Sequence, residues 1–294
     1  MGGKYGIAPW ILEHIKRFQF NVYVEPFCGS AAVYFRMVSE GIPEQIKSSN
    51  GKFTIVLNDT DSRLYNLFKT CREHPELLAH AVEYTPYSRK EHQLAHIDMG
   101  TVDDDIEMAR RYLADSYQSV YGFDSVRCKS RGRNTTDWDT SIFRPNGVIW
   151  NGVPNRIKLA AKALKNCYIE NSDFEKCIKT WDSLQTLHYV DPPYFGYDEY
   201  YKGGFDVESH KRLAQCLHEI EGQVILSYYP HEEILKYYSE SDWEFYYRDV
   251  LLHSELKSKI SLSKSRKKRT ELLLVRKRKN TDKKIDFTGQ LSLF

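Results

Sequence analysis

The sequence predicts an α/β protein built on a doubly wound sheet. Residues 21–27 (NVYVEPF) are rich in strand-forming residues and break at a turn of small residues, 28–32, into a helical pattern at 33–40. Strand patterns then alternate with helical ones over most of the chain. An apolar run at 187–190 stops abruptly at Asp191-Pro192-Pro193, as a buried strand does at the edge of a sheet.

The N-terminal part supplies the first elements of this pattern. Pro9 suits the first turn of a helix at 9–18, and Gly41 is typical of the end of the helix at 33–40. A strand at 53–57 (FTIVL) ends at Asn58-Asp59, and a helical pattern follows through Leu64 and Phe68.

The next region, from about residue 71 to 150, shows no strand pattern. Helical stretches lie at 75–82, 88–96 and 103–121, and the triplet Asp103-Asp104-Asp105 suits the N-terminal end of the last one through the helix dipole. We therefore expect an insert at 71–149 within a sheet domain made of residues 1–70 and 150–279, followed by a flexible charged tail at 280–294.

The alternation resumes after Asn155. Asp206 is expected to cap a helix that presents Leu213, Leu217 and Ile220 on one face. The remaining expected elements are helices at 155–164 and 231–238, strands at 167–170, 187–190, 223–228, 243–252 and 271–275, and a basic loop at 254–270.

Composition excludes several classes of protein. The 294 residues are 41% hydrophobic and contain no run long enough to span a bilayer. The polar start fits neither a signal peptide nor a myristoylation pattern. Six cysteines never form a Cys-x-x-Cys pair, so a disulfide scaffold and a zinc ribbon are disfavoured and reduced cytoplasmic thiols are expected.

Charge is distributed unevenly along the chain. Residues 254–284 contain 13 Lys and Arg against 3 acids, whereas the rest has 29 basic and 37 acidic residues. A basic run is often only a solvated surface, but this one contrasts with an acidic body. A polyanionic partner is therefore expected, and nucleic acid is the first candidate.

The Asp191-Pro192-Pro193-Tyr194 corner is the first candidate site. Each proline fixes its own φ and biases the preceding residue toward extended backbone, so Asp191 and Pro192 are held in one shape. Ligands bind at the carboxyl ends of strands in open α/β sheets. An ordinary turn from strand to loop would use the same residues.

The turn at 28–32 is the second candidate site. It contains a single glycine, Gly29, and no Walker A lysine, so it is neither a dinucleotide fingerprint nor a phosphate-binding loop. It suits a ligand that lies against backbone without phosphates, although it could be a plain tight connection. Asp59 follows the second strand, where an acid commonly binds ribose hydroxyls; its alternative role is to cap the next helix.

Five short segments carry a combined pattern: GGK (2–4), EPFCGSAAVYF (25–35), LNDTDSRLYNLF (57–68), YVDPPY (189–194) and RKKRTELL (266–273). In this order they resemble the Dam-type (alpha-group) DNA adenine-N6 methyltransferases. The resemblance covers roughly residues 1–70 and 150–276. It implies a Rossmann-like S-adenosylmethionine-dependent methyltransferase fold, with a mixed, mostly parallel seven-stranded sheet flanked by helices. Residues 71–149 would be a mainly helical target-recognition domain inserted into the catalytic domain.

The resemblance also implies site residues. Asp59 would bind the ribose of the cofactor, Asp173 and Phe174 would lie at its adenine, and Lys4 would lie near both the cofactor and the target base. For Asp173 a simple cap or turn is an equally good explanation. The remaining cofactor-binding residues would be Glu25, Pro26, Phe27, Cys28, Gly29, Ser30 and Asp191.

The residues at the corner fit methylation of an amine. The exocyclic amine of adenine is a poor nucleophile because its lone pair is delocalised into the ring. A carboxylate oxygen of Asp191 and the carbonyl of Pro192 could each accept one N–H and localise that pair for attack on a sulfonium methyl group. Pro193 stiffens the corner, Tyr194 offers a face for base stacking, and the base must first be flipped out of the duplex.

Two further segments are expected to bind macromolecules. A basic, Gly-containing stretch and the basic block near the C-terminus would contact DNA: Arg127, Lys129, Arg131, Arg133, Asn134, Lys264, Arg266, Lys267, Lys268 and Arg269. The final residues, Gln290, Leu291, Ser292, Leu293 and Phe294, resemble the pentapeptide by which bacterial proteins dock on the DNA polymerase sliding clamp. A frayed or core-docking C-terminus is the alternative for them.

The sequence therefore predicts a site-specific DNA adenine methyltransferase that uses S-adenosylmethionine and no metal. We expect double-stranded DNA as partner, a monomer or weak dimer, and a place in bacterial cytoplasm or in a phage, with no membrane association. Three alternatives stay open: a DNA cytosine-N4 methyltransferase, an RNA adenine methyltransferase and a non-catalytic DNA- or clamp-binding protein.

Overall fold

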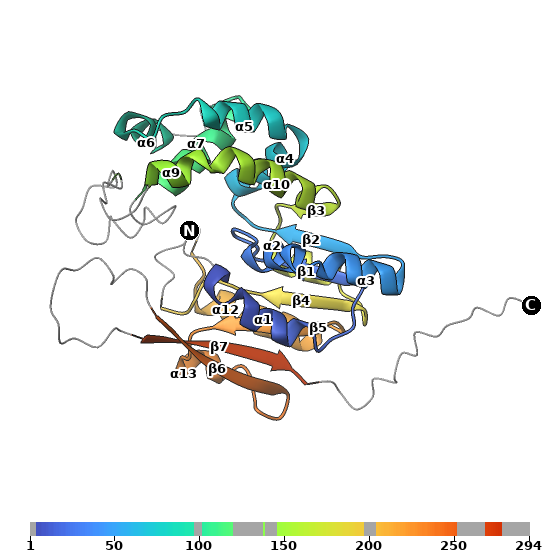
Figure 1. Cartoon of the computed structure of the whole chain (residues 1–294). Helices are drawn as coiled ribbons and strands as arrows, with labels where there is room; N and C mark the ends of the chain where they lie inside the picture. Colours follow the sequence, from blue (N-terminus) through green and yellow to red (C-terminus); the bar gives the residue numbers. More distant parts are fainter. Residues whose placement is uncertain are drawn as a thin grey trace, which may run out of the picture.

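The computed structural model describes residues 4–96, 102–119, 138, 146–196, 204–251 and 268–277. Among these, seven strands form one sheet in the order β3-β2-β1-β4-β5-β7-β6 (Figure 1). The first five run parallel, and β7 is antiparallel to both of its neighbours, β5 and β6. The strands are β1 (Val22–Glu25), β2 (Thr54–Asn58), β3 (Cys167–Glu170), β4 (Thr186–Val190), β5 (Gln223–Tyr228), β6 (Trp243–Leu251) and β7 (Lys268–Arg276).

The strand order reverses between β1 and β4. The chain runs outward from β1 through β2 to β3, then returns to place β4 on the other side of β1 and continues to β5. All residues of β4 and β5 are buried, as expected for central strands of a parallel sheet that is covered on both faces. The reversal puts the carboxyl ends of β1 and β4 at the position where open α/β sheets bind their ligands.

Helices cover both faces of the sheet because successive strand residues point to opposite sides. Tyr23, Leu187 and Ile225 pack into one hydrophobic cluster with α1 (Ala8–Ile15) and α2 (Ala32–Ser39). Val224 and Leu226 pack on the other face, in a cluster with α12 (Val207–Glu219). The other helices next to the sheet are α3 (Ile42–Asn50), α11 (Phe174–Thr180) and α13 (Glu232–Leu235).

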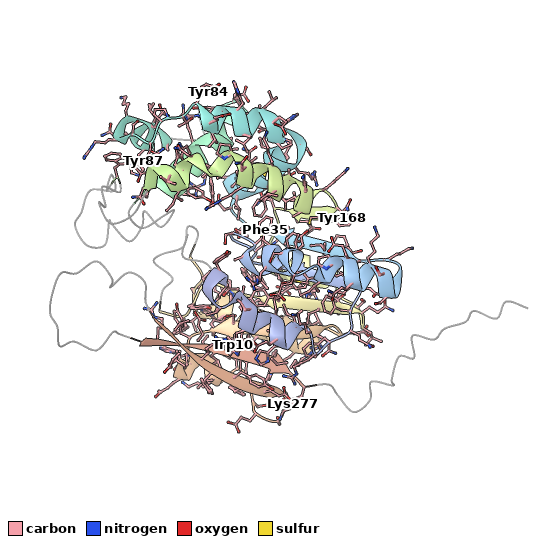
Figure 2. All side chains as sticks on the ribbon, viewed as in Figure 1. Trp10, Phe35, Tyr84, Tyr87, Tyr168 and Lys277 are labelled. Atoms are coloured by element: carbon pink, nitrogen blue, oxygen red, sulfur yellow. The ribbon has the colours of Figure 1, made fainter. Side chains whose placement is uncertain are left out.

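A group of helices lies beyond the β3 edge of the sheet (Figure 1). In this group α10 packs against α4 and α5, and α7 packs against α4 and α6. Tyr84, after α5, is on its outer side and is 74% exposed (Figure 2). The helices are α4 (Ser62–Glu73), α5 (Pro75–Glu83), α6 (Arg89–His96), α7 (Asp105–Gln118), α9 (Asn146–Asn151) and α10 (Val153–Leu164). The expected boundaries of the insert, near residues 70 and 150, fall inside α4 and α9, and this division of the chain stays a prediction.

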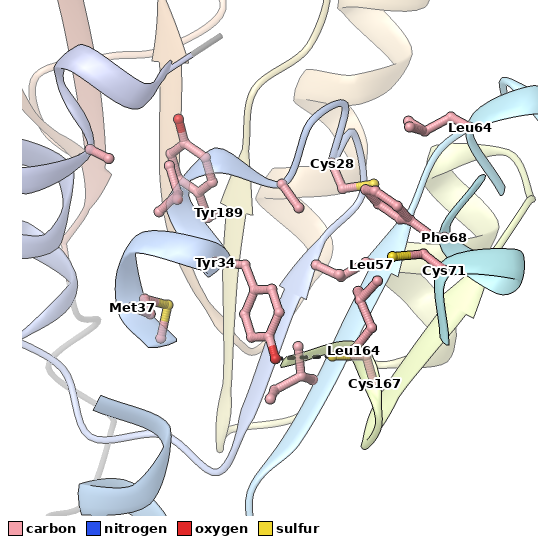
Figure 3. Close-up of a cluster of buried hydrophobic side chains, with 14 of the residues drawn as sticks. Cys28, Tyr34, Met37, Leu57, Leu64, Phe68, Cys71, Leu164, Cys167 and Tyr189 are labelled. Carbon is pink, nitrogen blue, oxygen red and sulfur yellow. Dashed lines mark hydrogen bonds between the residues drawn. The ribbon is translucent and has the colours of Figure 1, made fainter. Parts of the chain in front are cut away.

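The helical group and the sheet share one hydrophobic core. Leu64, Phe68 and Cys71 on α4 and Leu164 on α10 belong to the same buried cluster as Leu57 on β2 (Figure 3). The hydroxyl of Tyr34, on α2, donates to the carbonyl of Ala163 at 2.6 Å and accepts from the Cys167 thiol at 3.2 Å. Buried polar groups at this junction are therefore paired, which fixes α2 against β3.

Most predicted elements are present with bounds shifted by a few residues. The strands expected at 167–170 and 223–228 have those bounds, and Asp206 caps α12 by accepting from the Ser209 amide at 2.8 Å. Asp104, within the acidic triplet, caps α7 in the same way. Both caps satisfy amides that the first helical turn leaves unpaired.

Some predictions were wrong. Helices α3, α9 and α11 were not expected, and the helix expected at 231–238 is reduced to α13. The basic loop expected to reach residue 270 ends earlier, because Lys268 pairs with Leu251 and lengthens the ladder between β6 and β7. No helix in the described part of the chain has the length and apolar character that crossing a bilayer requires.

Candidate active site

The carboxyl ends of β1, β2 and β4 bring three predicted segments to one edge of the sheet. The turn after Glu25, the pair Asn58-Asp59 and the corner that begins at Asp191 each lie at the carboxyl end of a strand. These strands are neighbours and parallel, so their ends meet at the strand-order reversal.

Asp191 is the centre of the corner after β4. Its Oδ1 atom lies 3.3 Å from the Lys4 Nζ atom and accepts from the Tyr194 hydroxyl at 3.1 Å. Oδ2 has no hydrogen-bond partner in the described part of the chain. Burial raises the pKa of Asp191 to about 6; the charge of Lys4 opposes this shift and that of Glu271 adds to it. The carboxyl is therefore mostly ionised at neutral pH and has one oxygen available as an acceptor.

Lys4 reaches this corner from η1 (Lys4–Gly6) at the start of the described chain. Its ammonium donates to Glu271 at 2.9 Å and lies 4.5 Å from the centre of the Tyr194 ring. Burial lowers the pKa of Lys4, but Asp191 and Glu271 outweigh burial and hold the pKa above its ordinary value. Lys4 is therefore a permanent cation beside Asp191.

Tyr194 is 7% exposed, so most of its ring is covered in this structure. Its hydroxyl lies within hydrogen-bond distance of Asp191 (3.1 Å), Glu271 (3.0 Å) and Ser227 (3.2 Å). The edge of the Tyr229 ring meets it at a centroid distance of 4.2 Å. Pro192 is buried and Pro193 half-buried between Asp191 and Tyr194. Tyr194 thus connects the corner to β5 through Ser227 and to β7 through Glu271.

The turn after β1 is shaped by left-handed backbone at Gly29 (φ +47°). The Gly29 amide donates to Oδ2 of Asp59 at 3.0 Å, and Oδ1 of Asp59 accepts from the Asp61 amide at 3.0 Å. A Cβ atom at Gly29 would meet nothing within 4 Å, so open space lies beside the turn. Cys28 is buried in this turn, whereas Ser30 is exposed.

Asp59 does not cap the following helix. The cap of α4 is Asp61, which accepts from the Arg63 amide at 3.0 Å, so the alternative role expected for Asp59 is wrong. Burial raises the pKa of Asp59, and the two amides that bind its oxygens oppose the shift. Asp59 instead joins the glycine turn to the end of β2.

Asn58 was not predicted as a site residue, yet it connects three loops. Its buried side-chain amide donates to the carbonyls of Pro26 (2.9 Å) and Ser172 (3.0 Å). Its Oδ1 atom accepts from the amide of Ser172 at 2.9 Å and from the Ser172 hydroxyl at 3.1 Å. The sequence signal that could have indicated this role is the position of Asn58, a polar residue directly before Asp59 at the end of a strand.

Glu25, at the end of β1, is 2% exposed. Its Oε1 atom accepts from the Tyr23 hydroxyl at 2.8 Å and from the Tyr34 amide at 2.9 Å. Burial raises its pKa to about 8, and the two donors oppose the shift. Glu25 is therefore mostly protonated at neutral pH, and its carboxyl can donate as well as accept.

Aromatic residues form a wall near the end of β3. The Phe27 and Phe174 rings stack at a centroid distance of 5.2 Å, and Phe205 meets Phe27 edge-on at 5.6 Å. Asp173 caps α11 through the Glu175 amide at 2.9 Å, and its second oxygen accepts from Arg212 at 2.6 Å. The cap that we considered for Asp173 is thus present, and its cap signal could have indicated α11.

The predicted DNA-binding and clamp-binding residues lie mostly outside the described part of the chain. Arg269 is described: its guanidinium lies 4.6 Å from the centre of the Tyr229 ring and donates to the Tyr229 hydroxyl at 3.2 Å. The residues outside are Arg127, Lys129, Arg131, Arg133, Asn134, Lys264, Arg266, Lys267 and residues 290–294, and the side chain of Lys268 is likewise not described. Their binding roles stay predictions.

Comparison with known proteins decides the family. Residues 1–254 match the family model described as D12 class N6 adenine-specific DNA methyltransferase. The chain belongs to this family. The expected resemblance, fold class and enzyme class are confirmed.

Individual relatives of this D12 class methyltransferase are distant. The type II methyltransferase M1.LlaDCHI of Lactococcus lactis subsp. cremoris is 24% identical over 296 residues, which cover 93% of this chain and 92% of that protein. Two structures of the rRNA methyltransferase aviRa from Streptomyces viridochromogenes give TM-scores of 0.38 and 0.33 at 10% and 11% identity. Each aligns over 92% of this chain and 84% of the other.

Methyltransferases of this family and fold use S-adenosylmethionine, and the residues at the strand ends fit this cofactor. Open space beside Gly29 allows a ligand to lie against backbone, and the turn contains no cation suited to phosphates. The cofactor supplies an electrophilic methyl group on a sulfonium ion. Phe27 offers an uncharged aromatic surface that tolerates the loss of this charge during transfer.

Proposed function

We propose that this chain transfers the methyl group to N6 of an adenine that is flipped out of double-stranded DNA at a specific sequence. The observation that carries the proposal is the corner at Asp191, where one carboxylate oxygen is held by Lys4 and Tyr194 and the other lacks a hydrogen bond to any described residue. A fixed acceptor at a strand-order reversal is the arrangement that activation of a weak amine nucleophile requires.

In this proposal Asp191 and the Pro192 carbonyl each accept one hydrogen of the amine. The lone pair on nitrogen then becomes localised and points toward the sulfonium methyl group. The nitrogen–methyl bond forms as the sulfur–methyl bond breaks, and the electron pair of that bond stays on sulfur. One proton of the amine passes to the Asp191 carboxylate that accepts its hydrogen bond, and from there to solvent. The protein contributes position and electrostatics and forms no covalent intermediate. Tyr194 would stack on the base, which requires Lys4 or the base to adjust because the ammonium lies over that ring.

The proposed cofactor residues surround the turn after β1. Asp59, which accepts from the Gly29 amide, would bind the ribose. Glu25, Phe27 and Gly29 would line the methionine part. Asp173 and Phe174 would lie at the cofactor adenine; Arg212 holds the Asp173 carboxylate at the rim of the aromatic wall. The other proposed contacts are Lys4, Pro26, Cys28, Ser30 and Asp191.

DNA would be bound by the basic residues of 127–134 and 264–269, with the helical insert as the target-recognition region. Contacts of Lys and Arg to phosphates release counterions, so affinity should fall steeply with salt. We place the enzyme in the cytoplasm of a bacterium or in a phage-infected cell, acting as a monomer or weak dimer. Residues 290–294 would tether it to the sliding clamp.

Replacing Asp191 tests the proposal directly. Asp191→Ala should lower the rate of methyl transfer by about 100-fold or more, because an aligned charged acceptor is lost, while binding of DNA is largely retained. The rate is measured with labelled cofactor and unmethylated DNA, and the product is digested to nucleosides. Asp242→Ala, at an exposed turn before β6, is the matched control and should keep full activity.

Two outcomes would contradict the proposal. Retained transfer by Asp191→Ala would exclude the site. Label recovered in N4-methylcytosine, or only after incubation with RNA, would exclude adenine in DNA as the substrate and favour one of the alternative amines.

A further inference from the structure

Glu271 is a buried acid on β7, and none of the roles proposed above is assigned to it. It is 6% exposed. Leu273 and Val275, the alternate residues along β7, face the cluster that contains α1, so Glu271 points to the same side as the N-terminal segment. The antiparallel pairing of Leu272 with Tyr228 places it beside the carboxyl end of β5.

Glu271 shares its two donors with Asp191. Its Oε2 atom accepts from Lys4 Nζ at 2.9 Å and from the Tyr194 hydroxyl at 3.0 Å. The same nitrogen lies 3.3 Å from Asp191 Oδ1, and the same hydroxyl 3.1 Å from it. A phenol has one proton, so it donates to only one carboxylate at a time. Lys4 is held closer to Glu271 than to Asp191.

We propose that Glu271 is a positioning residue for methyl transfer: it holds Lys4 and the Tyr194 hydroxyl on one side of Asp191, so that Oδ2 stays open for the target amine. The inference rests on the acceptor role proposed for Asp191. With Glu271 neutral, Asp191 would be the one carboxylate among the described residues that pairs with the ammonium, and Lys4 could bind both of its oxygens. The acceptor would then be blocked and partly neutralised.

The charge of Glu271 also bears on the ionisation of Asp191. Glu271 adds to the effect of burial in raising the pKa of Asp191, whereas Lys4 opposes it. Removing the charge of Glu271 should therefore lower the pKa of Asp191 below about 6, and a closer Lys4 should lower it further. The titratable or charged groups that face this pair from the packed elements are Lys4, Glu25, Tyr189, Tyr194, Tyr229 and Arg269.

The test compares Glu271→Gln and Glu271→Asp with the unaltered protein in single-turnover methyl transfer between pH 5 and pH 9. For Glu271→Gln we expect a plateau rate about tenfold lower and an acid limb displaced to lower pH by about one unit. The dissociation constant for S-adenosylmethionine should change less than the plateau rate does, because Glu271 affects the cofactor only through Lys4 and Asp191.

Glu271→Asp keeps the charge but shortens the side chain, so its acid limb should stay in place while its plateau falls. Glu244→Gln is the control, because Glu244 is an acid of the same sheet that lies outside the site and pairs with the cation of Arg17. It should change neither the plateau rate nor the position of the acid limb. An unmoved acid limb in Glu271→Gln, with or without a lower plateau, would overturn the positioning role. If that variant does not fold, an unchanged plateau in Glu271→Asp would overturn it.

Failure of the proposed function gives a different result. An unaltered protein that binds S-adenosylmethionine but transfers no methyl group to any DNA would remove the proposed function together with this role. An active unaltered protein whose Glu271 variants keep its pH profile would remove only the role of Glu271.

Discussion

At the scale of single residues, the site is built from carboxyls with different ionisation. Asp191 has a pKa of about 6 and sits beside a permanent cation, whereas Glu25 has a pKa of about 8 and two hydrogen-bond donors. Both shifts start from burial, but only Asp191 has an ammonium that opposes it. At neutral pH the site therefore combines an ionised Asp191, which can only accept hydrogen bonds, with a protonated Glu25, which can also donate one.

Glu25 makes stability depend on pH. Its folded-state pKa is raised, so the folded chain holds a proton that the unfolded chain has lost between about pH 4.5 and pH 8. The contribution of Glu25 to the free energy of unfolding is thus fully present below pH 4.5 and is lost as the pH rises through 8. Glu25→Gln keeps an acceptor for Tyr23 and Tyr34 but does not titrate.

We expect Glu25→Gln to gain stability relative to the unaltered protein as the pH rises, by on the order of a few kcal/mol between pH 5 and pH 9. Urea denaturation at pH 5, 7 and 9 measures this difference, and comparing the two proteins cancels the effect of other titrating groups. A difference that does not change with pH would show that Glu25 is ionised in the folded state.

At the scale of elements, the loops that follow β1, β2 and β3 depend on one amide. Asn58 donates to the Pro26 and Ser172 carbonyls and accepts from Ser172, so all its hydrogen-bonding groups are used inside the fold. Asp59, the next residue, orients the Gly29 turn. The end of β2 is therefore the support on which the proposed cofactor loops rest.

Replacing Asn58 should weaken both the fold and cofactor binding. Asn58→Ala leaves buried donors and acceptors without partners, which should lower the free energy of unfolding by about 2–4 kcal/mol and raise the dissociation constant for S-adenosylmethionine about tenfold. Denaturation and cofactor titration measure the two effects. Asn171→Ala is the control: it is exposed and donates once, to the Asp59 carbonyl at 2.7 Å, so it should cost less than about 1 kcal/mol. Equal effects of both variants would contradict this account.

At the scale of the whole molecule, the sheet is proposed to carry the chemistry and two other parts to bring it to DNA. The helical group shares its hydrophobic core with the sheet through α4 and α10, so it should keep a defined position relative to the strand ends. We expect the charged tail at 280–294 to act as a tether and not as part of the site.

Deleting residues 290–294 should separate tethering from catalysis. Capture of the truncated protein by a bacterial sliding clamp should be lost, because the Leu and Phe side chains that would fill an apolar pocket are gone. Methylation of free DNA should be unchanged. The double replacement Leu293→Ala with Phe294→Ala is the finer variant and should behave like the deletion; undiminished clamp capture would exclude the tether.

The sequence by itself determined the type and order of most elements and the two loops of the candidate site. Strand and helix periods are local, and so is the break that a small-residue turn or a proline pair makes at the end of a strand, which is why the order of elements was predicted correctly. Helix α11 was missed because its short pattern depends on a cap at Asp173 that could also be read as a ligand.

Only the tertiary structure decided which groups surround Asp191. Lys4 and Glu271 are 267 positions apart and meet because β7 inserts antiparallel beside β5 and brings alternate residues to the face where η1 lies. No local period contains that information. The ionisation of Asp191 and Glu25 is also a tertiary property, since it depends on burial and on charges from distant strands.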